Sequence, residues 1–251
     1  MERDDLAPLA GVFFGSAPFE RGAIVRLDEE AAHHLRVRRL ERGDRVYLAD
    51  GAGSHATGSI VRLGKKDADI SIDAVTHTVP PPAIHMLVPI ADRDRMMWCA
   101  EKCAELGASS WRPVMWHRSR SVSPRGEGDA FTQRVRARMT SALVQSRAPW
   151  LPEIHGDLSV PAAIAQLADG GSRLMLDQVG APIAGEDCSA PVTIAVGPEG
   201  GMEASERELL RDAGFRPVSL GANVLRFETA AVAALAIVRS KLSVFPETTN
   251  G

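Results

Sequence analysis

The chain has 251 residues, enough for one large or two modest domains. Its composition, with 45% hydrophobic and 24% charged residues, is ordinary for a globular protein, and no run of about 18 apolar residues offers a transmembrane helix. The net charge of -3 shows no overall preference for nucleic acid, while a charged N-terminus without an apolar core and only three cysteines favour a cytoplasmic protein over a secreted one.

The region before residue 80 has the pattern of a small β-domain. Short runs that mix apolar or β-branched residues with polar ones are separated by turn signals, and they predict strands at 23–27, 45–49, 58–62 and 70–75. A helix is expected over 28–39, with Asp28 as its N-cap. Short strands joined by tight turns favour a small barrel.

Three successive prolines, Pro80 to Pro82, predict a stiff connector, so we place a domain boundary there, with domains at 1–79 and 80–251. After the prolines, strands alternate with helices. The pattern predicts strands at 84–89, 111–116, 173–177, 191–196 and 216–220, and helices at 93–106, 131–146, 204–213 and 228–242. Such alternation indicates a parallel sheet covered by helices on both faces.

Arginine is concentrated in two segments. Residues 33–45 contain five arginines against two acids, and residues 112–138 contain seven against two. This asymmetry points weakly to an anionic partner. Solvated arginines on helix faces explain each cluster equally well.

The strongest local motif is Gly197-Pro198-Glu199-Gly200-Gly201, between an apolar strand and a helix. Ligands of open α/β sheets bind beyond the carboxyl ends of strands, and glycines there let the backbone approach a ligand. The spacing differs from G-x-G-x-x-G, and the acids Glu203 and Glu206 oppose a phosphate at this helix start. A tight turn without a ligand remains the alternative.

A second motif covers residues 218–230, where Arg226 and Glu228 stand between an apolar strand and a helix of small apolar residues. A charged pair in this position is either an ion pair at the helix start or part of a site. The small residues at 230–238 suit close packing against other helices.

Together, GPEGG and the later LGANVLRFETA resemble the small-subunit ribosomal RNA uridine-N3 methyltransferase family (RsmE-like) of the SPOUT class. Weaker matches are His33-His34-Leu35-Arg36, Asp94-Arg95-Met96, Arg120-Ser121 and Gln145-Ser146-Arg147. The resemblance covers about residues 10 to 242 and implies an α/β fold with a SPOUT-type trefoil-knotted parallel sheet, preceded by a PUA-like RNA-binding β-barrel.

The resemblance also implies a homodimer that uses S-adenosyl-L-methionine to methylate N3 of a specific uridine in 16S rRNA of the small ribosomal subunit. Loop backbone groups would bind the adenine, with Leu220 and Leu225 against its ring. The residues implied to bind the cofactor are Leu176, Gly197, Pro198, Glu199, Gly200, Gly201, Ser219, Leu220, Gly221, Val224 and Leu225.

For catalysis we expect Arg226 to stabilise charge on the uracil oxygens or to orient the base. Glu228 would accept the N3 proton or merely anchor Arg226. The expected RNA-binding residues are Arg36, Arg38, Arg39, Arg118, Arg120 and Arg147. No metal or membrane is expected, and Cys99 with Cys103 reads as a pair on a helix face.

The sequence departs from the family at Asn223, where Arg is usual, at Phe227, where Thr is frequent, and at Glu203, where Ser or Thr is usual. The missing arginine weakens the assignment of the target most, because an arginine there would bind RNA phosphate. Two alternatives follow: an RNA-binding protein with a SPOUT fold and no activity, and a SPOUT methyltransferase with a different RNA target.

Overall fold

The computed structural model describes residues 11–15, 18–121 and 129–242, except for the side chains of residues 120 and 121. The chain divides into two compact units. Unit 1 contains the residues up to Pro80 together with Thr140–Leu151, and unit 2 contains Pro81–Met139 and the residues from Pro152 onward. The first change of unit therefore falls within the proline run, whereas residues 140–151 belong with the first unit.

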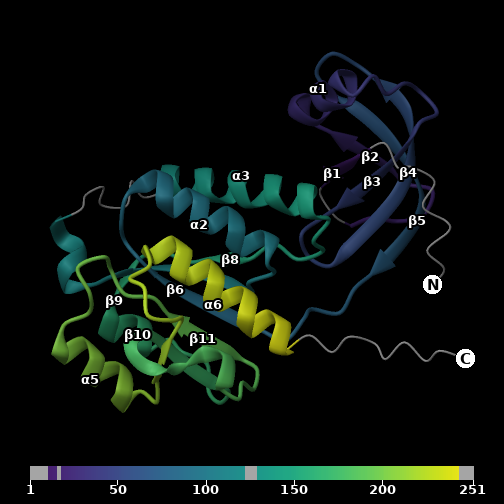
Figure 1. Cartoon of the computed structure of the whole chain (residues 1–251). Helices are drawn as coiled ribbons and strands as arrows, with labels where there is room; N and C mark the ends of the chain where they lie inside the picture. The colour runs from purple at the N-terminus through teal and green to yellow at the C-terminus, as the bar shows by residue number, and fades with distance from the viewer. Residues whose placement is uncertain (1–10, 16–17, 122–128, 243–251) are drawn as a thin grey trace, which may run out of the picture. The chain divides into compact units, whose positions relative to one another are not determined.

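Unit 1 is built on a five-stranded sheet (Figure 1). The strand order is β1 (Val12–Phe14), β3 (Arg45–Ala49), β4 (Ser54–Leu63), β5 (Ala68–His77) and β2 (Ile24–Leu27). Only β1 and β3 pair in parallel. The register of β4 against β5 shifts twice, and such bulges bend a sheet.

Helix α1 (Glu29–Val37) covers the core of unit 1. Its N-cap is Asp28, whose carboxylate accepts a hydrogen bond of 2.9 Å from the backbone N–H of Ala31. The buried side chains of α1 join those of all five strands in one cluster, which includes Ala32, Leu35, Val46, Leu48, Ile60, Ile70 and Ile72. One face of the curled sheet is therefore buried, which explains the alternation of apolar and polar residues along β4.

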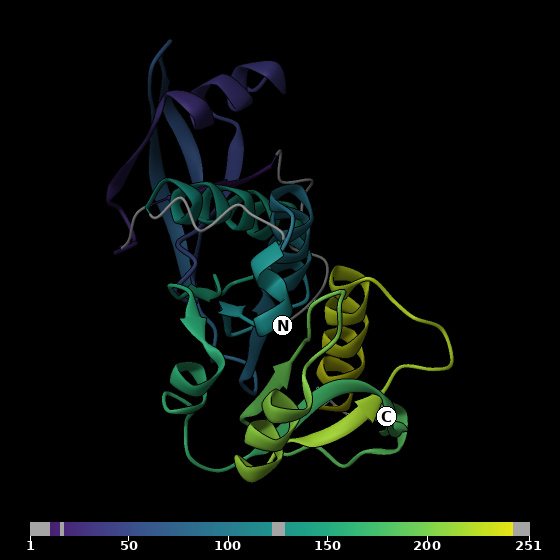
Figure 2. The same cartoon turned by 90° about the vertical axis from the view of Figure 1, so that its left-hand side faces the viewer.

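Unit 2 is built on a seven-stranded parallel sheet (Figures 1 and 2). The order is β12 (Arg216–Ser219), β10 (Ser172–Pro182), β11 (Val192–Ala195), β6 (Ile84–Pro89), β7 (Ser110–Met115) and β8 (Glu153–Ile154), with β9 (Leu158–Ser159) also pairing β7. Its helices are α2 (Arg93–Glu105), α4 (Val160–Ile164), α5 (Ala204–Asp212), α6 (Phe227–Leu242) and the first part of α3 (Asp129–Ser146).

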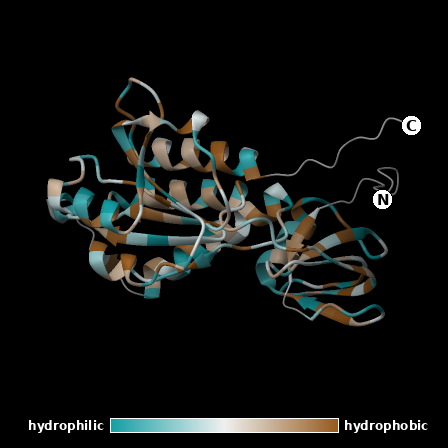
Figure 3. Cartoon of the chain, turned by 90° about the horizontal axis from the view of Figure 1, so that it is seen from below, coloured by the Kyte–Doolittle hydropathy of each residue, from teal (hydrophilic) through white to brown (hydrophobic). Residues whose placement is uncertain are grey.

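Helices cover both faces of this sheet. On one face, α4 and α5 place Val160 and Leu210 in a cluster with Leu87 of β6. On the other, α6 packs against β6, β11 and α2. Figure 3 shows α6, the helix that leads into the C-terminal trace, mostly in the tan and brown of apolar residues. Ala231 and Ala234 of α6 are fully buried, so the helix lies close to the sheet.

The predicted α/β class, with a parallel sheet and helices on both faces, is confirmed. Strands β1, β8 and β9 and helix α4 were not predicted, because each is too short to show a period. Strand β10 continues past the predicted end at residue 177 to Pro182, through Gly180 and Pro182, residue types that are depleted in strands.

The structure also describes the cysteines, the possible metal ligands and the length and polarity of the helices. Cys99 and Cys103 are buried on α2 with their sulfur atoms 4.0 Å apart, and burial with this contact raises the pKa of Cys103. Among the described residues, no cluster of histidine, cysteine and carboxylates is suited to a metal ion. In the same part of the chain, every helix is too short or too polar to cross a membrane.

Candidate functional site

The middle of β10 and the loops that follow β11 and β12 surround one cavity of about 420 Å³ in unit 2. All eleven residues predicted to hold the cofactor line it: Leu176, Gly197, Pro198, Glu199, Gly200, Gly201, Ser219, Leu220, Gly221, Val224 and Leu225. They come together because parallel strands place their carboxyl ends at one edge of the sheet. Asn223 and Phe227, two of the departures from the family pattern, also line it.

The glycines of the first loop are required by its geometry. A Cβ atom at Gly197 would lie 2.9 Å from Cγ of Met202, so a larger residue would displace the wall of the cavity. Gly201 has a φ of +75°, and its N–H donates to the carbonyl of Pro198 at 2.8 Å. The sequence Gly-Pro-Glu-Gly-Gly thus forms a tight turn that is also the cavity wall.

The two acids at the start of α5, Glu203 and Glu206, interact with other residues of the chain. Glu206 is buried, and its carboxylate accepts hydrogen bonds from the N–H groups of Glu203 and His117, at 2.8 and 2.7 Å. The Glu203 carboxylate lies 2.8 Å from Nδ1 of His117. Glu203 occupies the N-cap position, so it takes the place of the usual Ser or Thr and ties the helix to the His117–Ser121 turn.

One ion pair in the cavity wall was missed by the sequence analysis. Asp177, next to the predicted Leu176, lies only 2.7 Å from Nε of Arg207, and its side chain is 6% exposed. Both residues line the cavity. The signal in the sequence was an acid directly after an apolar strand, but its partner 30 residues later could not be inferred from spacing.

A second cavity, of about 840 Å³, shares Pro198, Glu199 and Gly200 with the first. It is also lined by Ile90, Ala91, Asp92, Arg95, His117, Arg118, Ser119 and Glu203. Arg118, predicted to bind RNA, donates a hydrogen bond to the carbonyl of Gly200. The Gly-Pro-Glu-Gly-Gly loop therefore separates two cavities, and a cation from the Arg-rich segment holds it.

The two predicted catalytic residues differ in their surroundings. Glu228 is buried in the first turn of α6, with Oε1 3.9 Å from Nε of Arg95, and no hydrogen bond to its Oε2 is found in the described part of the chain. Arg226 is exposed and lines neither cavity, and its carbonyl accepts a hydrogen bond from the N–H of Ala230. Glu228 thus lies next to Arg95 of α2.

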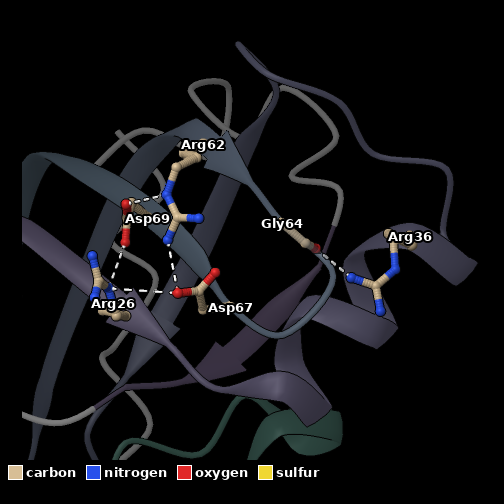
Figure 4. Close-up of polar contacts among 6 residues, drawn as sticks. All are labelled: Arg26, Arg36, Arg62, Gly64, Asp67 and Asp69. Carbon is tan, nitrogen blue, oxygen red and sulfur yellow. Dashed lines mark hydrogen bonds and ion pairs between the residues drawn. The ribbon is translucent and has the colours of Figure 1, made fainter.

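The remaining predicted RNA-binding arginines are divided between the two units. Arg36 is half-buried and donates to the carbonyl of Gly64, as Figure 4 shows. Arg38 and Arg39 at the end of α1 and Arg147 after α3 are exposed. These four belong to unit 1, and Arg118 belongs to unit 2. The side chain of Arg120 lies outside the described residues.

Figure 4 also shows a second group of arginines in unit 1 that are engaged with acids. Asp69 lies 2.6 Å from Nε of Arg62 and 3.0 Å from Nε of Arg26, and Asp67 lies 2.9 Å from Nη2 of Arg62. Hydrogen bonds from Arg62 and Arg26 lower the pKa of Asp69 to about 2. These arginines are therefore occupied by carboxylates of their own sheet.

Comparisons with known proteins find two family models that match the chain, one in its N-terminal part and one in the remainder. Residues 79–239 match the model of the RNA methyltransferase domain family, and residues 27–73 match that of the RNA methyltransferase PUA domain. The chain is 29% identical over 243 residues to "Ribosomal RNA small subunit methyltransferase E" of Mycobacterium bovis, covering 92% of this chain and 91% of the relative. The protein of the same name from Synechocystis is 28% identical over 228 residues, 88% and 74% of the two chains.

Among solved structures, the ribosomal RNA small subunit methyltransferase E from Neisseria gonorrhoeae, bound to S-adenosyl methionine, is similar with a TM-score of 0.80. The two chains are 27% identical, and the match covers 92% of this chain and 97% of the other. The likeness therefore extends over both units.

Proposed function

Because the chain belongs to the RNA methyltransferase domain family, we propose that it methylates N3 of a specific uridine in 16S rRNA, with S-adenosyl-L-methionine as the methyl donor. The observation that carries this proposal is the convergence of eleven predicted cofactor residues on one cavity. The relative from Neisseria gonorrhoeae binds the same cofactor, and the name of the relatives gives the small ribosomal subunit as the substrate.

The residues of the first cavity fit this cofactor. Its volume of about 420 Å³ lies in the range of small-molecule sites. Leu176, Leu220 and Leu225 provide apolar surface for the adenine ring, and the loops offer backbone groups outside helices and strands. Asp177 and Glu199 add two carboxylates to the lining, each paired with an arginine. When bound, S-adenosylmethionine supplies a methyl group on a cationic sulfonium, which is easily transferred.

The chain's own residues must then prepare the nucleophile. Uracil N3 carries a proton, so a base is needed, and we assign this role to the carboxylate of Glu228, whose Oε2 is buried without a hydrogen bond from the described residues. Arg226 follows Leu225 at the cavity wall and is exposed, so we assign it to orienting the target nucleotide as it enters. The transfer requires no metal ion.

The organisation of the chain supports an enzyme that holds a large RNA. In this proposal, residues 1–79 form the PUA-like RNA-binding domain and residues 80–251 form the knotted SPOUT methyltransferase domain. Exposed Arg38, Arg39 and Arg147, together with Arg118 and Arg120, contact the rRNA backbone, whereas Arg36 is engaged with the carbonyl of Gly64. We place the protein in the cytoplasm, because three cysteines without a disulfide framework suit a reducing compartment.

We also assign a homodimer to the active form. Val179 and Val224 line the first cavity and are 82% and 81% exposed, which is unusual for large apolar side chains beside a binding site. A second copy of the chain that covers this rim would bury them and exclude water from the cofactor.

The test begins with isothermal calorimetry of S-adenosylmethionine binding. The protein is then incubated with small ribosomal subunits that lack uridine-N3 methylation, and the rRNA is mapped by mass spectrometry. Cofactor binding with one new methyl group on a uracil base supports the proposal. Binding without methylation favours a different RNA target, and no cofactor binding favours an RNA-binding protein without activity.

A further inference from the structure

The position of the acceptor is limited by the geometry of methyl transfer. Reacting atoms must approach to roughly 3–3.5 Å, so the acceptor must occupy space that adjoins the cofactor cavity. The second cavity shares Pro198, Glu199 and Gly200 with it. A third cavity, of about 260 Å³ and lined by Trp111 and His155 among others, shares no residue with it. Of the second and third cavities, only the second therefore adjoins the cavity in which the methyl donor is proposed to bind.

Ser119 gives the second cavity a polar group without a partner. The residue is 5% exposed and lines this cavity, and its Oγ atom makes no hydrogen bond with the described part of the protein. A buried hydroxyl without a partner is costly, so buried polar groups are nearly always hydrogen-bonded. A ligand with a hydrogen-bonding edge in this cavity would complete the bonding of Ser119.

Arg95 provides a cation at the border of the two cavities. It stands in the first turn of α2, which Asp92 caps through hydrogen bonds from the N–H groups of Asp94 and Arg95. Its guanidinium is held by Glu199 and lies 3.9 Å from Glu228. Arginine has five N–H donors, more than these two carboxylates engage, so donors remain for a ligand.

The partners of Arg95 connect it to both halves of the proposed reaction. Glu199 lines the cofactor cavity and the second cavity. Glu228 is the carboxylate assigned to the N3 proton. A base that contacts Arg95 from within the second cavity therefore lies near a proton acceptor and near the wall of the cofactor site.

We propose that the second cavity receives the target uracil, and that Arg95 and Ser119 bind the two carbonyl oxygens that flank N3. This inference rests on the proposed function and adds two substrate-contacting residues to it. As the N3 proton passes to Glu228, negative charge spreads onto those oxygens, where Arg95 and Ser119 donate hydrogen bonds. The N3 electron pair then bonds to the methyl carbon, and the carbon–sulfur bond breaks with its electrons left on sulfur as a neutral thioether.

Variants of the two residues test this role with turnover as the readout. Arg95→Gln should lower kcat about 100-fold or more, the usual effect of removing a donor to a developing oxyanion, and Arg95→Lys should restore part of it. Ser119→Ala should lower kcat roughly tenfold. In calorimetry, Arg95→Gln and Ser119→Ala should both bind S-adenosylmethionine with the affinity of the unmodified protein. Arg211→Gln, an exposed arginine on α5, is the matched control and should keep full kcat.

The pH profile separates this role from a structural one. At higher pH, solution deprotonates the uracil and reduces the need for a cation. The rate of Arg95→Gln should therefore rise more steeply with pH than that of the unmodified protein. A parallel pH profile with unchanged kcat in Arg95→Gln and Ser119→Ala would overturn the inference. Loss of cofactor binding in both variants would overturn it too, because it would assign them to the first cavity.

A crosslinking experiment with the unmodified protein does not depend on variants that fold. Small subunits carrying 4-thiouridine at the methylated position are irradiated with the protein, and the linked peptide is identified by mass spectrometry. A link within the peptides of Arg95 or Ser119 supports the inference, and a link confined elsewhere refutes it. If the unmodified protein binds no cofactor or methylates no uridine, the proposed function itself fails, which is a separate outcome.

Discussion

The two units use charged residues in opposite ways. In unit 1, Arg62 and Asp67 pair on the outer surface of an antiparallel sheet, where both side chains remain accessible to solvent. In unit 2, Glu206 and Glu228 are buried at the beginnings of helices, and the side chain of Asp177 is buried in the middle of the parallel strand β10. Burying a charge costs free energy unless the charge is paired or has a function. The buried carboxylates of unit 2 therefore indicate the functional site.

The difference follows from the two sheet types. An antiparallel sheet keeps one face in water, and its charges can pair there without desolvation. A parallel sheet covered on both faces leaves its polar residues at the strand ends, where loops gather them around a cavity. Substituting one member of a pair in each unit therefore tests two expectations. Buried charges in unit 2 should matter for catalysis and stability, and solvent-exposed pairs in unit 1 should matter little for either.

The largest effect is expected at Glu228. Glu228→Gln keeps the size of the side chain but removes its basicity, so kcat should fall about 100- to 10,000-fold, as for loss of a general base. Cofactor affinity should stay the same. Steady-state kinetics with small subunits measures this, and Glu208→Gln on the exposed side of α5 is the control. Full turnover in Glu228→Gln would assign the N3 proton to another acceptor.

The next effect is on stability and compares one ion pair from each unit. Arg207→Ala leaves the carboxylate of Asp177 buried without its partner, which should cost about 2–3 kcal/mol after allowance for the partial exposure of Arg207. Arg62→Ala removes the contacts of Arg62 with Asp67 and Asp69, but Arg26 still pairs with Asp69, so the unfolding free energy should fall by less than about 1 kcal/mol. Urea denaturation of both variants measures their free energies of unfolding. Equal losses would show that burial does not distinguish the two pairs.

The sequence predicted the framework of unit 2 and eleven of the residues that line the first cavity, because the glycine motif and the Leu-Gly-Ala-Asn motif are contiguous segments at strand ends. It missed Asp177 and Arg207 of the same cavity. It did not predict Arg95 or Ser119 as site residues. Arg95 contributes to the site only because α2 begins beside the loop of Glu199, 104 residues later. Such a contact depends on strand order, which local periodicity does not encode.

Arg36 is a different case. It was predicted to bind RNA because it lies in an arginine-rich helix, yet its guanidinium donates to the carbonyl of Gly64 within unit 1. Composition shows how many cations a segment carries, but the partner of each depends on the turn that folds against it. The short strands β8 and β9 were missed for a related reason, since two residues have no recognisable alternation.

A third comparison concerns backbone packing beside the cofactor cavity. Gly180 of β10 approaches β12 so closely that a Cβ atom would lie 2.4 Å from the backbone N of Val218. Gly180→Ala should therefore destabilise unit 2 by about 1–3 kcal/mol through overpacking. Gly156→Ala, at a position with open space, should be close to neutral. Thermal unfolding of both variants measures this, and a neutral Gly180→Ala would mean that the strands separate without cost.

A smaller effect is expected from the exposed arginines of unit 1. Arg39→Gln should weaken RNA binding several-fold and reduce the slope of log affinity against log salt by about 1, as for loss of one phosphate contact. Arg36→Gln should leave that slope unchanged, because its guanidinium is engaged with Gly64. Binding titrations at several salt concentrations compare the two. A lower slope in Arg36→Gln would show that it reaches phosphate as well.

The smallest effect is the pH dependence of unfolding. Burial lowers the pKa of His85 and of His155, and nearby positive charge, from His155 and Arg112 respectively, lowers each further. The unfolded chain therefore takes up protons below pH 6.5 that the folded unit 2 resists, so stability should fall as the pH drops from 7.5 to 5.5. The Asp69 pairs of unit 1 should persist in this range, because the pKa of Asp69 is about 2. His155→Gln should flatten the dependence of the melting temperature on pH, whereas Asp69→Asn should not. An equal slope in the protein and in His155→Gln would place the titrating groups elsewhere.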